Sequence, residues 1–156
     1  MVDKESYVQE IEAHSSMMYR VALTILRNDD DVKDALQEAA LKAWVKRDTL
    51  RDESKFATWM TRILINECYT IRRKSRRLVP MDELPPQPCR DGDITLRLLL
   101  EALPESLRLP LVLRCAEGMD EAEIAAVLHL TRPTVRGRIH RARKMLRKEL
   151  EDHADA

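Results

Sequence analysis

Hydrophobic positions recur every three or four residues along most of this chain, which is the spacing of amphipathic helices. In the first half, the pattern predicts helices over about 7–26, 30–46 and 56–77. The sequence NDDD at 28–31 predicts a turn and a cap for the second of them. Only three glycines occur among the 156 residues, which favours an all-α fold.

Prolines interrupt the helical pattern in the middle of the chain. Residues 78–93 hold four of the seven prolines, and four acids against one arginine. Such a segment cannot build a helix and predicts a linker. We therefore expect an all-α protein with two small helical domains, 1–77 and 94–156, joined by a flexible linker.

The second domain carries the pattern of a helix-turn-helix over 119–148. Asp120 is the expected N-cap of its first helix, with Glu123 three residues later as in a capping box. Thr131 is placed to cap the next helix, and Pro133 falls in the first turn, where no backbone N–H is needed. The inward positions of this last helix are Val135, Ile139, Ala142 and Leu146.

The last helix is strongly basic on its outward face. Between Arg132 and Lys148 it holds eight Lys or Arg and no acid. A charge run is more often a solvated surface, but here a capped partner helix and a tight turn accompany it, which favours DNA binding. The residues left facing outward are Arg136, Arg138, His140, Arg141 and Arg143.

Two helices of the first domain carry candidate binding faces. The 56–77 helix has a stripe of polar, basic and aromatic residues that can contact phosphates, a base edge and an unpaired base: Thr58, Arg62, Asn66, Tyr69 and Arg73. A polar, flexible loop over 47–55 precedes it, with Ser54 as the expected cap. The 30–46 helix mixes acids with apolar residues, as in a protein-docking face: Asp34, Gln37, Glu38, Leu41 and Trp44. On residues alone, a solvated stripe and a core position for Trp44 remain open alternatives.

Composition excludes several function classes. The formal net charge is zero, because the basic residues are clustered rather than in excess. Cys68, Cys89 and Cys115 have no zinc-type spacing, and buried helix packing is the expected role of Cys68 and Cys115. The four histidines show no metal spacing, and no phosphate-binding glycine loop or nucleophile elbow occurs. We expect no enzyme and no cofactor, metal or small-molecule substrate, but a soluble, cytoplasmic protein without a membrane span.

The order of these motifs resembles one family. DALQEAALKAW, SKFATWMTRILIN with a basic tail, a Pro-rich linker, LPESLRLPLVLR and the helix-turn-helix are similar to bacterial sigma factors of the extracytoplasmic-function (ECF) group. The resemblance covers both domains. It implies that 1–77 corresponds to sigma region 2 and 94–156 to region 4, so the chain would direct core RNA polymerase to promoters.

The resemblance also implies roles for the candidate faces. The mixed face of the 30–46 helix would bind the beta-prime clamp of core RNA polymerase, and region 4 would meet the beta flap. Asn66 would contact a flipped base of the −10 element, supported by Lys55, Thr58, Arg62, Tyr69 and Arg73. The −35 element would be read by Arg136, Gly137, Arg138, His140 and Arg141, with phosphate contacts from Arg114, Arg132 and Thr134. An anti-sigma factor, in some relatives membrane-anchored, would be a further partner and would hold the protein at the membrane.

Three departures from the family pattern leave the promoter sequence open. His129 stands where glycine is usual, which implies a mildly strained left-handed turn. Gly137 lies inside the recognition helix, and Pro133 replaces a small residue near its start. A helix-turn-helix regulator that acts without polymerase is the alternative interpretation. It explains the second domain but not the two faces of the first.

Overall fold

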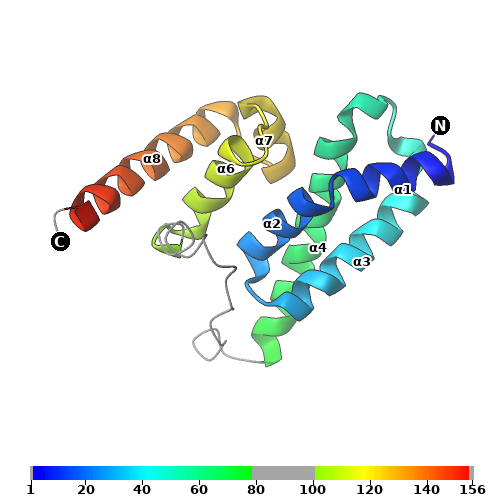
Figure 1. Cartoon of the computed structure of the whole chain (residues 1–156), viewed down its shortest axis with the longest axis horizontal. Coiled ribbons are helices and arrows are strands. Elements are labelled where there is room, and N and C mark those ends of the chain that lie inside the picture. Colours follow the sequence, from blue (N-terminus) through cyan, green and yellow to red (C-terminus); the bar gives the residue numbers. More distant parts are fainter. Residues whose placement is uncertain (1, 79–100, 155–156) are drawn as a thin grey trace. The chain divides into compact units, whose positions relative to one another are not determined.

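A computed structural model describes residues 2–78 and 101–154, so the predicted linker lies almost wholly outside the described residues. The chain forms two compact units, Met1–Gln87 and Pro88–Ala156. Every regular element of the described residues is helical (Figure 1), which confirms the all-α prediction.

Within residues 2–78, the first unit contains four α-helices and two short 3₁₀ helices. These are α1 (Lys4–Ala13), α2 (Ser15–Leu26), α3 (Asp29–Val45), η1 (Arg47–Thr49), η2 (Glu53–Lys55) and α4 (Phe56–Leu78). Helices α2, α3 and α4 pack against one another, so that α3 and α4 share one core. The bounds of α3 and α4 lie within one residue of the predicted ones.

The single helix predicted over 7–26 is wrong, because the helix breaks at His14. The backbone of His14 leaves the helical region (φ −105°, ψ 8°), while its ring Nδ1 lies 2.8 Å from the Glu10 carbonyl oxygen. The imidazole packs beside the ring of Phe56, with 5.6 Å between centroids. The break also lets the Tyr7 hydroxyl of α1 donate a hydrogen bond to the Ala40 carbonyl of α3. Periodicity could not reveal this break because it depends on contacts with distant residues.

The turn before α3 follows the sequence expectation. Asn28 is the N-cap, and its side-chain oxygen accepts from the backbone N–H groups of Asp30 and Asp31 at 2.9 and 3.2 Å. Small residues line the inner face of α3, and all are fully buried: Val32, Ala35, Ala39 and Ala43. They allow α3 to approach its neighbours closely.

Aromatic side chains gather at one end of the first unit. The Tyr7 ring lies 5.2 Å from Trp44 and 6.3 Å from Phe56, and Phe56 lies 5.7 Å from Trp59. Farther along α4 the core becomes aliphatic, with Met60, Leu64 and Ile65 buried. The aromatic cluster thus joins α1, α3 and the start of α4.

The described part of the second unit, residues 101–154, contains α6 (Glu105–Cys115), α7 (Glu121–Leu128) and α8 (Arg132–Ala154). Helix α6 packs against both α7 and α8. The core is aliphatic, and its largest fully buried side chains include Leu113, Ile124, Val127 and Val135. The chain after residue 87 contains no Phe, Tyr or Trp. None of the described helices of either unit combines the length and the apolar character needed to cross a bilayer.

Candidate nucleic-acid and protein interfaces

The helix-turn-helix of the second unit forms with the predicted caps. The Asp120 carboxylate accepts from the backbone N–H of Glu123 at 2.8 Å, and Thr131 Oγ1 accepts from the N–H of Thr134 at 3.3 Å. His129 ends α7 in the left-handed region (φ 58°, ψ 43°), as the sequence predicted for a position where glycine is usual. These contacts fix where α8 starts relative to α7.

Most of the predicted −35 residues face solvent. Arg132, Arg136, His140 and Arg141 are exposed on α8, and Arg114 is exposed on α6. Gly137, Arg138 and Thr134 are half-buried, and the Thr134 hydroxyl lies 2.8 Å from that of Thr131. Val135, Ile139 and Ala142 are buried as predicted. The structure therefore separates a basic outer face of α8 from its apolar inner face. Arg138, which was predicted to face outward, is half-buried.

An ion pair between α7 and α8 was not visible in the sequence. Nη2 of Arg136 lies 3.0 Å from Oε2 of Glu121, and Nε lies 3.1 Å from the same oxygen. The two residues are 15 positions apart, so no helical spacing connects them. The turn at His129 brings the first turns of both helices together.

The stripe on α4 is accessible along its length. Arg62, Asn66 and Arg73 are exposed, whereas Thr58 and Tyr69 are half-buried. The guanidinium of Arg72 lies 4.8 Å from the centre of the Tyr69 ring, a cation–π contact that the sequence analysis missed. One face of Tyr69 is thus occupied by a cation.

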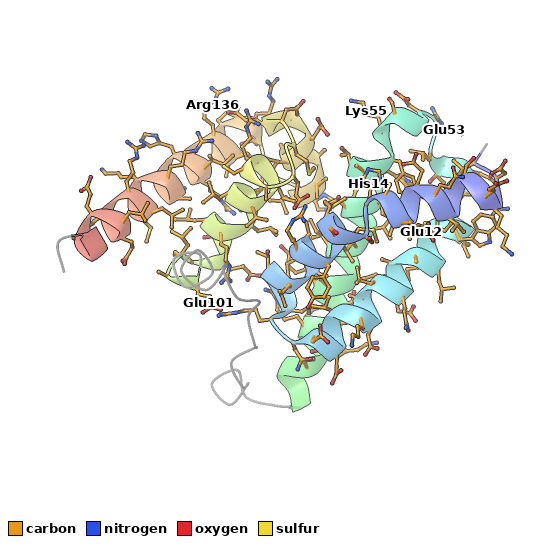
Figure 2. The ribbon with its side chains drawn as sticks, in the orientation of Figure 1. Glu12, His14, Glu53, Lys55, Glu101 and Arg136 are labelled. Atoms are coloured by element: carbon orange, nitrogen blue, oxygen red, sulfur yellow. The ribbon has the colours of Figure 1, made fainter. Side chains whose placement is uncertain are left out.

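The segment before α4 is more ordered than a flexible loop. It folds into η1 and η2, and Asp52 is the cap where Ser54 was predicted. The Asp52 carboxylate accepts from both the N–H and the hydroxyl of Ser54, at 3.0 and 2.6 Å. Trp59 Nε1 donates to Thr49 Oγ1 at 3.3 Å, which ties η1 to α4. Lys55 is exposed at the end of η2 and points outward in Figure 2.

The mixed face of α3 is accessible except at one end. Asp34, Gln37, Glu38 and Leu41 are exposed. Trp44 is half-buried: it packs on Tyr7, and the Arg47 guanidinium lies 4.0 Å from its ring centre. Trp44 is therefore only partly in the core, and its docking role stays a prediction. Val45, 75% exposed, extends the apolar part of this face and was missed, although its position four residues after Leu41 is the helical spacing that could have revealed it.

A polar contact joins the docking helix to the stripe helix. Lys42 of α3 forms an ion pair and hydrogen bond with Glu67 of α4. Glu67 is buried although it neighbours the exposed Asn66. The hydrogen bond from Lys42 and its charge satisfy a carboxylate that burial would otherwise destabilise.

The two described cysteines lie in different environments. Cys68 is buried in the first unit, and burial raises the pKa of its thiol to about 12. Cys115 is exposed, 3.7 Å from Nη2 of Arg143, so the predicted buried role is wrong for this residue. It is the last residue of α6. Among the described residues, no group of three or more His, Cys, Asp or Glu side chains could hold a metal ion.

Comparison with known proteins agrees with this arrangement. Residues 11–78 match the family model of Sigma-70 region 2, and residues 94–146 match that of Sigma-70, region 4. The sigma-E ECF factor of Escherichia coli K12 is 31% identical over 137 residues, which cover 74% of this chain and 72% of that protein. Sigma factor SigV of Bacillus subtilis is 29% identical over 146 residues, covering 90% and 88%.

Two solved structures share the fold. The sigma factor RpoE of Bartonella quintana, in complex with the anti-sigma factor NepR, gives a TM-score of 0.81 at 26% identity and covers 94% of this chain and 98% of that one. CnrH, in complex with the cytosolic domain of CnrY, gives 0.74 at 27% identity and covers 99% and 92%.

Proposed function

This chain belongs to the ECF family of RNA polymerase sigma factors. We propose that separate exposed faces of the chain recognise the −35 element, recognise the −10 element and bind the polymerase. The chain is an alternative sigma factor, which binds core RNA polymerase and directs transcription initiation, and it is not an enzyme. The observation that carries the proposal is the presence of two exposed polar faces, on α4 and α8, on the units that match regions 2 and 4.

Helix α8 is the proposed reader of the −35 element. Its exposed arginines supply the positive charge that displaces counterions from DNA, while side chains in the major groove distinguish bases. Arg141 and His140 are fully outward, and Gly137 offers no side chain that would hold the backbone away from DNA. Arg136 and Arg138 complete the proposed reading set. Arg114, Arg132 and Thr134 are the proposed phosphate contacts.

Helix α4 is the proposed reader of the −10 element as the strands separate. Extruding a base costs a few kcal/mol of stacking and pairing, which contacts to the flipped base must offset. Asn66 can form paired hydrogen bonds with a base edge, and the proposed support comes from Lys55, Thr58, Arg62, Tyr69 and Arg73. The hydrogen bonds of Asp52 and Trp59 hold η1 and η2 in place, which supports a preformed surface at this end of α4.

The exposed face of α3 is the proposed contact for the beta-prime clamp. Asp34, Gln37 and Glu38 supply polar contacts, and Leu41 and Trp44 supply apolar area. Leu41 is 62% exposed, as expected of a residue that becomes buried only in a complex. The second unit is the proposed partner of the beta flap.

An anti-sigma factor is the further proposed partner. RpoE, which shares this fold, was solved with the anti-sigma factor NepR, and CnrH, which also shares it, was solved with the cytosolic domain of CnrY. We propose that this chain works in the cytoplasm. A membrane-anchored anti-sigma factor would hold it at the membrane in an inactive state.

In vitro transcription with core polymerase on a promoter library tests the proposal. We expect Asn66→Ala to impair strand opening and −10 preference, and Arg141→Ala to impair −35 binding. Gln9→Ala, which removes an exposed amide from α1, and Arg147→Ala, which removes an exposed cation from α8, are the matched controls. Normal opening and −10 preference in Asn66→Ala would contradict the assignment of α4. A pull-down in which core polymerase does not bind would instead favour a regulator that acts without polymerase.

A further inference from the structure

The ion pair between α7 and α8 has no role in the function proposed so far. Arg136 contributes one edge of its guanidinium, with Nε and Nη2 at 3.1 and 3.0 Å from Oε2 of Glu121. The Arg136 side chain is nonetheless 67% exposed, and Figure 2 shows it projecting outward from the first turns of α8.

The geometry of the guanidinium determines which hydrogen-bond donors of Arg136 remain available for DNA. The group is planar, with donors along two usable edges that can each hold a pair of acceptors. Glu121 occupies the Nε–Nη2 edge, so the edge that carries Nη1 remains for another bidentate partner. Guanine O6 and N7 are such a pair in the major groove. An arginine held in advance also loses less side-chain entropy when it binds.

Glu121 lies within a group of cations. The hydrogen bond from Arg136, followed by the charges of Arg136, Arg132 and Arg114, lowers the pKa of Glu121. The carboxylate is therefore ionised near neutral pH. These three arginines are all in the proposed −35 surface, so Glu121 places one negative charge among groups that would face DNA.

We propose that Glu121 is a positioning residue for −35 recognition, which aims the free edge of Arg136 at a base pair and reduces the non-specific attraction of this surface for DNA. The inference rests on the proposed function, because it assumes that α8 enters the major groove. It predicts that Glu121 raises sequence discrimination while it lowers affinity for arbitrary DNA.

A purely structural role predicts a different result. If the pair served only to hold α7 on α8, its loss would lower stability and leave discrimination unchanged. Exposed ion pairs contribute little to folding, and the buried contacts of Ile124, Val127 and Val135 already join these helices. We therefore expect thermal unfolding of Glu121→Gln, followed by circular dichroism, to resemble that of the parent protein.

The test uses the full chain bound to core polymerase on a promoter library randomised at −35, together with the free chain on one fixed 30-base-pair duplex of arbitrary sequence. For Glu121→Gln we expect discrimination at one base pair to fall by about 3- to 10-fold. We also expect the logarithmic salt dependence of binding to the arbitrary duplex to steepen by up to about 0.9, the value for one more phosphate contact. Glu151→Gln, which removes an exposed acid near the far end of α8, should change neither quantity.

The variant Arg136→Ala tests whether Glu121 acts on base preference through Arg136. In that background, Glu121→Gln should no longer alter base preference. Unchanged discrimination in Glu121→Gln, or in Arg136→Ala itself, would overturn the positioning role and leave −35 recognition by the rest of α8 intact. Absence of any −35 preference in the parent protein would instead overturn the proposed function of α8.

Discussion

Single residues of the same type differ here because of their surroundings, as the cysteines show. Cys68 is buried with a thiol pKa raised to about 12, whereas Cys115 is exposed. At pH 8, only about one Cys68 side chain in 10,000 would be the reactive thiolate. In a Cys89→Ser background, we expect a thiol reagent to modify Cys115 of the native protein at once. We expect it to modify Cys68 only in denaturant. Rapid modification of both would contradict the burial of Cys68.

The Lys42–Glu67 pair leads to a second prediction at this scale. Replacing Lys42 with Met leaves a buried carboxylate without its partner, so Lys42→Met should lower the melting temperature more than Lys42→Met combined with Glu67→Leu. The hydrogen bond and charge of Glu67 raise the pKa of Lys42 above 10.5. The stabilisation is therefore present at neutral pH and is lost only as the pH rises above that value. Thermal melts of the parent protein, Lys42→Met and the double variant at pH 7.5 and pH 11 measure the order of stability and its pH dependence. A double variant no more stable than Lys42→Met would contradict the prediction.

At the scale of elements, the sequence was reliable where the determinants are local. The starts of α3, α7 and α8 follow from caps at Asn28, Asp120 and Thr131, which bind backbone only two or three residues away. The break at His14 was not predictable because it depends on Phe56, far along the chain. The Arg136–Glu121 pair was missed for the same reason.

Gly137 allows the helix and its DNA-binding role to be tested separately. A Cβ built there would lie 3.4 Å from Nη1 at the flexible end of Arg141 and otherwise meet no side chain of its own unit. Because glycine destabilises a helix interior, we expect Gly137→Ala to raise the free energy of unfolding by about 0.5–1 kcal/mol, measured by chemical denaturation. We expect the same change to weaken −35 binding, measured by fluorescence anisotropy, because the methyl group occupies the proposed approach to DNA. Unchanged DNA binding would show that the backbone does not come close to the groove.

At the scale of the whole molecule, net charge is a poor guide to behaviour. The chain has 27 basic and 27 acidic residues, yet between Arg132 and Lys148 helix α8 holds eight Lys or Arg and no acid. We expect DNA affinity to fall steeply with salt, with a logarithmic slope of about −4.5 if roughly five phosphates are contacted. Titrations between 50 and 200 mM salt measure it. A slope near zero would exclude phosphate contacts as the source of affinity.

The aromatic cluster of the first unit, set against the aliphatic core of the second, determines what optical spectroscopy can detect. All Trp and Tyr residues of the chain precede residue 88, so intrinsic fluorescence reports on the first unit alone. Trp44, half-buried on the face proposed to meet polymerase, is a natural, label-free probe of docking. Far-ultraviolet circular dichroism responds to helices of both units. An unfolding midpoint measured by fluorescence therefore does not report on the helix-turn-helix. Its unfolding must be measured by circular dichroism, which detects the helical backbone.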